Sequence, residues 1–302
     1  MYYLGLCGIM SCGDRTKNIT KKVAKKLFLI GVIAMTWGSF GIVHITTLIL
    51  AAGIIAGLYF ILKKLPTMVQ TIVMGVLSLS GLAAIVFNLT SWHSPLEYLP
   101  FHLCSLNALV LPVAVFTKSR ILNNLLLLWA FGSLAALVVN TAQADFEVFS
   151  PTFAFYFFPH TFEVGIPLLM FLLGHAKRDV RCIASTLIIT LAAYTGVHLI
   201  NVILNAHCIE NSLKDPSGAL IQVNYMYSIK PENPVLQLFY DLVPQPFFYM
   251  LLAIPVVLLY LGGIYSDKLF PPKATTLAPS KNNTENLYIQ YPRAFTWVLI
   301  RK

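Results

Sequence analysis

Long apolar segments separated by short polar connections dominate this chain. Segments with almost no charged residues occur at 42–62, 66–88, 99–117, 121–141, 154–174, 180–205 and 246–265. Such lengths suit α-helices that cross a hydrocarbon core of about 30 Å. The segments lack the alternation of apolar and polar residues that membrane-barrel strands show. The pattern therefore predicts an all-α, polytopic membrane helix bundle with about seven transmembrane helices.

The remaining residues divide the chain into three parts. Residues 1–38 form a basic leader with an interfacial or half-inserted helix around 27–37, and the glycines at 38 and 41 provide the hinge that follows. Residues 39–266 form the seven-helix membrane domain. Residues 267–302 form a flexible polar tail, whose last apolar patch, 294–300, is too short to cross a membrane.

Charge decides the predicted orientation. The chain is 57% hydrophobic and 11% charged, and its net charge of +9 comes from basic residues near the ends of apolar segments, which does not indicate nucleic-acid binding. The first, third and fifth loops are basic, whereas the second and fourth contain no lysine or arginine. The positive-inside rule therefore predicts a multi-pass cell-membrane protein with these odd loops and the C-terminus in the cytoplasm, and the N-terminus outside. The leader contradicts this orientation, since its six basic residues favour the cytoplasm. If residues 27–37 cross the membrane, there are eight spans and both ends of the chain are inside.

Polar residues gather near the predicted outer ends of the spans. At about 1.5 Å of rise per residue, they lie within roughly 5–15 Å of the outer boundary. The residues concerned are His44, Asn88, His102, Cys104, Asn107, Asn140, His160, Glu163, His198, Asn201 and Asn205. Because a polar group facing lipid is costly, we expect them to face the bundle interior. The sequence predicts an outward-facing polar pocket, roofed by the long loop at about 206–245.

The pocket residues suggest nucleophilic chemistry. Cys104 needs a base to become a thiolate, and His160 and His198 lie at matching depth. His102 is a poor base by helical periodicity, because residues two apart point to nearly opposite sides. Glu163 would either orient His160, as the third member of a triad does, or form a supporting hydrogen bond around the site. A lipid would place its acyl chain among apolar side chains and its ester at the polar groups, which predicts acyl transfer or hydrolysis through a thioester.

The catalytic residues assigned from sequence are Cys104, His160 and Glu163. The residues assigned to substrate binding are His102, Asn107, Asn140, His198, Asn201 and Tyr225. Of these, His198 with Asn201 or Asn140 would also donate hydrogen bonds to the oxyanion.

The residues also support non-catalytic interpretations. Intramembrane cysteine, histidine and asparagine often only pack against or bond to neighbouring helices, and this interpretation is favoured for His44 and Asn88. A metal site would need clear ligand pairs, which are absent, so no metal and no cofactor is expected. A transporter or receptor would bind a polar or lipid ligand in the same pocket, although no internal repeat is present. The sequence leaves open whether the chain is an enzyme; its expected partners are membrane lipids, with no nucleic acid and no identified protein partner.

Three sequence motifs carry a family resemblance. They are Leu99-Pro-Phe-His-Leu-Cys-Ser-Leu106, Phe157-Phe-Pro-His160, and Asn224-Tyr-Met-Tyr227 followed by Lys230-Pro-Glu-Asn-Pro-Val-Leu236. The region from about 39 to 265 resembles the YwaF family of integral membrane proteins, whose eukaryotic members are of the transmembrane protein 164 type. The resemblance implies a seven-span bundle and, for the eukaryotic branch, a cysteine-dependent phospholipid acyltransferase-like activity. It would make Cys104 the nucleophile and His160 the base, whereas the bacterial branch, which this chain resembles most, has no established activity.

Overall fold

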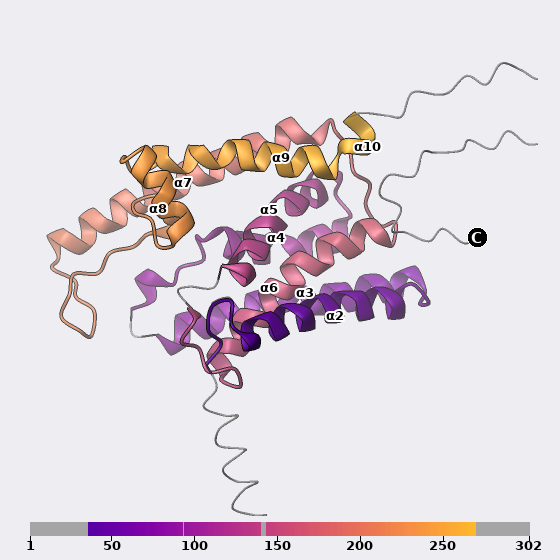
Figure 1. Ribbon diagram of the computed structural model, residues 1–302, viewed down its shortest axis with the longest axis horizontal. Helices are drawn as coiled ribbons and strands as arrows, with labels where there is room; N and C mark the ends of the chain where they lie inside the picture. The colour runs from indigo at the N-terminus through magenta and orange to yellow at the C-terminus, as the bar shows by residue number, and fades with distance from the viewer. Residues whose placement is uncertain (1–35, 93, 140–142, 270–302) are drawn as a thin grey trace, which may run out of the picture.

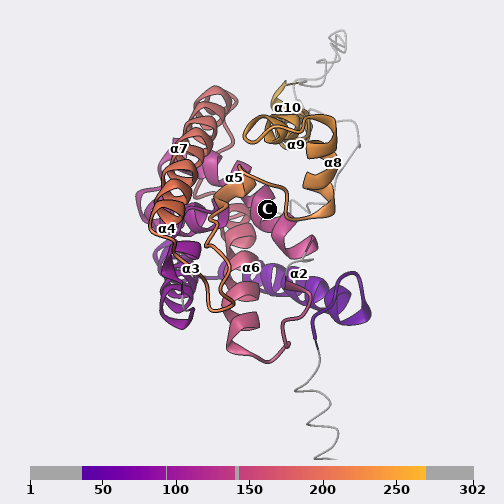
Figure 2. The ribbon, with the colours of Figure 1, turned by 90° about the vertical axis from the view of Figure 1, so that its left-hand side faces the viewer.

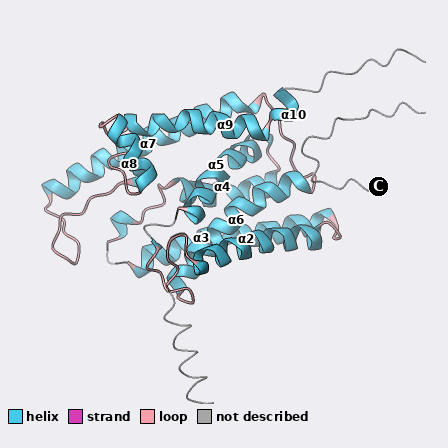
Figure 3. Ribbon diagram, in the orientation of Figure 1, coloured by secondary structure: helices cyan, strands magenta, loops and turns pink. Residues whose placement is uncertain are grey.

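The computed structural model describes residues 36–92, 94–139 and 143–269. The predicted leader up to residue 35, Asn140 and the tail from residue 270 lie outside these described residues. Within the described ranges the fold is helical, and the only extended pairings are two isolated bridges. The predicted all-α helix bundle is confirmed (Figure 3).

Seven apolar helical segments coincide with the seven predicted spans. They are α2 (Ile42–Leu62), α3 (Thr67–Ser91), α4 (Leu103–Thr117), α5 (Arg120–Val138), α6 (Pro151–Leu172), α7 (Cys182–Glu210) and the continuous segment Phe248–Ile264, made of η4 (Phe248–Ala253) and α9 (Ile254–Ile264). Five of them are long and apolar enough to cross a membrane, whereas α4 and the η4–α9 segment are shorter. Four small elements complete the described fold: η1 (Pro95–Glu97), η3 (Tyr225–Tyr227), α8 (Pro234–Leu242) and α10 (Ser266–Leu269).

Helix α6 is the central helix of the bundle. It packs against α2, α3, α4 and α5, while α7 packs against α5. In both ribbon views, α5 and α6 lie between α2 on one side and α7 and α9 on the other (Figures 1 and 2). Large apolar side chains remain exposed on α2, α3 and α7, as expected for helices that face lipid.

Small residues allow α3 to approach the centre closely. A Cβ atom on Gly81 would lie 2.5 Å from the Ala108 Cβ and 3.4 Å from the Glu163 Oε1. Small residues at such crossings let helix backbones pack tightly in membranes, where contact packing drives association. The crossing of α3 and α4 therefore depends on the missing side chain at position 81.

The residues before α2 join the bundle at the end where α4 begins, called here the site end. The backbone N–H groups of Trp37 and Gly38 donate to the carbonyls of Phe146 and Ala144, which precede α6. Gly38 adopts φ +68°, a left-handed conformation that glycine tolerates, at one of the two glycines of the predicted hinge. This start of the described chain thus lies at the same end as the loop between α5 and α6.

His44 is engaged on both sides of its ring. Its Nδ1 accepts a hydrogen bond from the Phe40 N–H at 2.9 Å, and its Nε2 donates to the Leu137 carbonyl at 2.7 Å. The side chain is fully buried. These contacts favour the packing interpretation of His44 over a catalytic one.

Replacing Gly81 with alanine tests the α3–α4 crossing. The added Cβ would collide with Ala108, and overpacking of this kind typically costs about 1–3 kcal/mol. We expect Gly81→Ala to destabilise the fold and therefore to lower the melting temperature of the purified chain in detergent. Gly53→Ala is the matched control, because its Cβ would meet nothing within 4 Å. Equal melting temperatures for the two variants would contradict the proposed close contact.

Candidate active site

Cys104 is the second residue of α4, directly after the N-cap residue His102 and Leu103. The chain before this helix is fixed by Tyr225, whose hydroxyl accepts from the Leu99 N–H at 3.3 Å and donates to the Leu96 carbonyl. Burial raises the pKa of Tyr225 to about 12, so its hydroxyl keeps the donated proton at neutral pH. The Cys104 side chain is partly exposed and lies at the positive end of the helix dipole, which favours an anion there.

The ring of His102 has one defined protonation pattern. Its Nδ1 accepts a hydrogen bond from the Met226 backbone N–H at 3.4 Å. An imidazole nitrogen that accepts carries no proton, so in the neutral ring Nε2–H is the remaining donor. Aromatic rings of Tyr225 and Tyr227 flank the imidazole, with centroids at 5.4 Å and 5.6 Å.

His160 has the opposite protonation pattern. Its Nδ1 lies 2.7 Å from the Tyr156 carbonyl oxygen, one turn earlier on α6. Because a carbonyl only accepts, Nδ1 must carry the proton, which leaves the neutral ring with Nε2 as an acceptor. The Tyr156 ring stacks on the imidazole at 4.2 Å and holds its plane. His102 and His160 interact electrostatically, so a ring that presents a donor and a ring that presents an acceptor influence one another at the site end.

Glu163 belongs to a buried polar chain that crosses three helices. The Ser133 hydroxyl of α5 donates to the Glu163 Oε2 at 2.7 Å and accepts from the Asn107 Nδ2 of α4 at 3.2 Å. All three side chains are buried, and the Asn107 Oδ1 has no hydrogen-bond partner among the described residues. Glu163 also interacts electrostatically with Cys104. The hydrogen bonds of the described residues thus join Glu163 to Ser133, whereas its predicted pairing with His160 is not among them.

Two tyrosines at this site were not singled out from the sequence. Tyr156 and Tyr227 each interact electrostatically with Cys104, and they also interact with one another. Tyr156 lies four residues before His160, so helical spacing could have placed it on the same face. Nothing in the sequence was a reason to select Ser133, because a single serine in an apolar helix is common and its partners come from other helices.

The remaining predicted residues support the turn η3 that covers His102. Asn201 of α7 accepts from the Tyr225 N–H and donates to the Tyr225 carbonyl and the Ser228 hydroxyl, at distances of 2.8–3.0 Å. His198 Nδ1 contacts the same hydroxyl at 3.0 Å. Met226 and Tyr227 both have positive φ, at 51° and 55°, a conformation that costs energy for bulky residues.

These contacts use both N–H donors of the Asn201 amide, which leaves none for a substrate oxyanion. Asn140, the other predicted donor, lies outside the described residues. Within the described ranges, no three His, Cys, Asp or Glu side chains gather in a way that could hold a metal ion.

The fold defines a polytopic helical membrane protein, in which α4 carries Cys104 directly after His102 and Leu103, and α6 carries His160 and the buried Glu163. Residues 21–265 match the model of the TMEM164 family. The match covers most of the chain, which therefore belongs to the TMEM164 family, as the sequence motifs predicted. Neither the characterised proteins nor the solved structures contain a match to this chain.

Asn201 provides a test of the turn over the site. Replacing it with leucine would leave the Tyr225 N–H without a partner and would remove one of the two hydrogen bonds to the Tyr225 carbonyl. The unpaired buried N–H costs about 1–3 kcal/mol. We expect Asn201→Leu to increase hydrogen–deuterium exchange across residues 223–228 and to lower the melting temperature. Asn211→Ala is the control, since Asn211 is exposed and bonds only within its own helical turn. Unchanged exchange across 223–228 in Asn201→Leu would contradict this role.

Proposed function

We propose that this chain is a membrane enzyme that transfers or hydrolyses the acyl groups of phospholipids, with Cys104 as the nucleophile. The observation that supports this most is the complementary pair of imidazoles at the site end, where the helix that carries Cys104 begins. His160 presents an acceptor and His102 a donor, each fixed by a backbone hydrogen bond of its other nitrogen. Acyl transfer needs both functions, one to take the thiol proton and one to stabilise the developing negative charge.

In the proposed first step, the Cys104 Sγ attacks the ester carbonyl carbon of a phospholipid. The thiol proton passes to the His160 Nε2, and the carbonyl oxygen becomes an oxyanion that accepts a hydrogen bond from the His102 Nε2–H. Collapse of this intermediate breaks the ester C–O bond. The departing lysophospholipid oxygen takes the proton from His160, which leaves an acyl thioester on Cys104.

In the second step, a hydroxyl group attacks the thioester. His160 takes the proton of the attacking hydroxyl, and the Cys104 sulfur leaves and recovers that proton. A lysophospholipid hydroxyl gives acyl transfer, and water gives hydrolysis, with the same atoms and the same proton balance. The two outcomes differ only in which hydroxyl reaches the thioester.

Glu163 acts as a positioning residue in this proposal. Its bond to Ser133, and that of Ser133 to Asn107, links α6 to α5 and to the helix that carries the nucleophile. Asn107 lies three residues after Cys104, so this chain fixes the rotation of α4 about its axis. The carboxyl group thereby sets where the thiol points without touching the substrate.

Acyl exchange in lipid nanodiscs tests the proposal directly. The full chain is reconstituted with phosphatidylcholine bearing a labelled acyl chain and with an unlabelled lysophospholipid, and labelled product is followed by mass spectrometry. We expect Cys104→Ser to abolish product and His160→Gln to reduce the rate by about 10²–10⁴-fold, the usual contribution of a general base. His102→Phe removes the proposed oxyanion donor and keeps an aromatic ring, and for it we expect a rate about 10²–10³-fold lower.

Cys182→Ser serves as the control, because Cys182 begins α7 at the opposite end of the bundle from Cys104. It should retain wild-type rates. A rate that survives Cys104→Ser would contradict the nucleophile, and one that is indifferent to His160→Gln would contradict the base. Absence of both transfer and hydrolysis in the folded wild-type chain would contradict the proposed function itself.

A further inference from the structure

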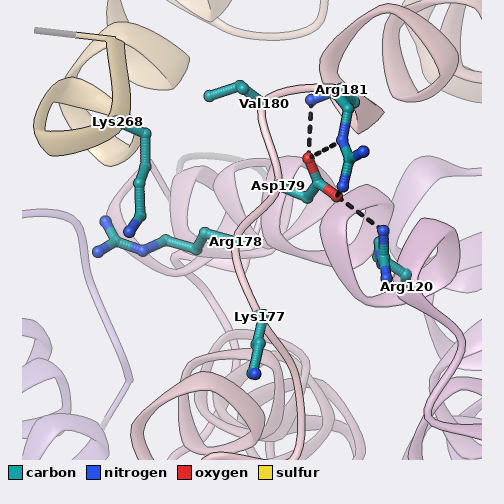
Figure 4. Close-up of a pocket in the computed structure, with 7 residues that line it drawn as sticks. All are labelled: Arg120, Lys177, Arg178, Asp179, Val180, Arg181 and Lys268. Atoms are coloured by element: carbon teal, nitrogen blue, oxygen red, sulfur yellow. Dashed lines mark hydrogen bonds and ion pairs between the residues drawn. The ribbon is translucent and has the colours of Figure 1, made fainter.

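A basic cavity lies at the end of the bundle where α5 begins, called here the basic end. Its volume is about 380 Å³, and it is lined by Arg120, Lys177, Arg178, Asp179, Val180, Arg181 and Lys268 (Figure 4). Five of these seven side chains are positively charged and one is negative. They come from the start of α5, the loop between α6 and α7, and α10, which are distant in sequence.

The loop that supplies most of these residues is held in a fixed shape. Buried Asn124 of α5 donates to the Lys177 carbonyl at 3.2 Å and accepts from the Asp179 N–H at 3.1 Å. Tyr265, next to α10, donates its hydroxyl proton to the same amide oxygen. A side chain that is internal to the bundle therefore sets the position of the cationic loop.

Asp179 orients two of the arginines. It pairs with Arg120 at 3.0 Å and with Arg181 at 3.1 Å, as the dashed lines in Figure 4 show. Hydrogen bonds from Arg181 lower the pKa of Asp179 to about 2, so its charge is constant at physiological pH. One carboxylate facing two guanidinium groups orders them without neutralising both.

The other cations are less compensated. Arg178 pairs with Asp267 at 3.0 Å, whereas neither Lys177 nor Lys268 forms an ion pair with any described residue. Both lysine side chains are exposed. The cavity therefore gathers like charges, an arrangement that a bound anion would stabilise.

We propose that this cavity binds the phosphate group of an anionic phospholipid. Arginines held in a fixed fork match phosphate oxygens, and lysines add charge at the rim. A lipid is favoured over a soluble phosphate compound because exposed apolar residues adjoin the basic ones: Ile121 follows Arg120, and Leu269 follows Lys268. The acyl chains would lie along this apolar surface while the headgroup occupies the cavity. The site lies at the end predicted to be cytoplasmic, remote from Cys104, and does not depend on the proposed acyl chemistry.

The positive-inside rule alone also places basic residues at this end, so the test must separate a built site from general surface charge. Native mass spectrometry of the full chain in detergent measures retention of added phosphatidylglycerol against phosphatidylcholine. The variant Lys177→Gln/Lys268→Gln removes the two unpaired cations. We expect preferential retention of phosphatidylglycerol by the wild type, and affinity at least about tenfold weaker in this variant, since each basic residue contributes substantially to anionic-lipid binding.

The matched control is Lys63→Gln/Lys64→Gln, which removes two exposed lysines from the loop between α2 and α3, predicted to lie on the same side. We expect its affinity to stay within about threefold of the wild type. Equal weakening in both variants would overturn the site in favour of general surface charge, as would equal retention of the two lipids by the wild type. Inorganic phosphate and glycerol 3-phosphate distinguish the source: failure to displace the lipid at millimolar concentration supports a phospholipid, and complete displacement overturns it in favour of a soluble phosphate.

Discussion

The polar chain from Asn107 through Ser133 to Glu163 is the interaction on which the site end of the bundle depends. Hydrocarbon offers no water to satisfy polar groups, so each of these side chains must find its partner on another helix. Their hydrogen bonds join α4, α5 and α6, and Gly81 lets α3 close over the same point. Burying a carboxyl group at this place costs free energy. The hydrogen bonds that it forms fix the position of the helix bearing Cys104 relative to the helix bearing His160.

The segment that contains η3 and covers His102 must also satisfy its polar groups with partners from other parts of the chain. The segment containing η3 has irregular backbone near the start of α4, so its N–H and C=O groups need partners from side chains. Asn201 and Asn205 of α7 supply them, each with both a donor and an acceptor. In return, the Met226 N–H fixes the tautomer of His102. The strained turn and the chemistry of the imidazole are therefore parts of one hydrogen-bonded unit.

Hydrophobic patterning was sufficient to find all seven helical segments, and Ile42–Leu62 was located to the residue. Helical periodicity was used to judge His102, but the structure places this residue before the first helical residue of α4. It is the N-cap of α4 with extended backbone, φ −70° and ψ 154°, so spacing rules for helix faces do not apply to it. The role of Asn201 was also beyond the sequence, because an intramembrane asparagine facing a pocket and one supporting a loop give the same pattern. Ser133 acquires its importance only from partners on two other helices.

The site end and the basic end of the bundle differ in charge, but in both a buried asparagine holds an irregular segment in place. At the site end, buried polar side chains form hydrogen bonds to one another across helices. At the basic end, charges are exposed and only partly compensated, yet Asn124 holds their loop from inside the bundle, much as Asn201 holds η3. In both places a buried asparagine amide fixes an irregular segment by offering it a donor and an acceptor together. Asn124 thereby positions the loop of Lys177 and Asp179, and Asn201 positions the turn that bonds to His102.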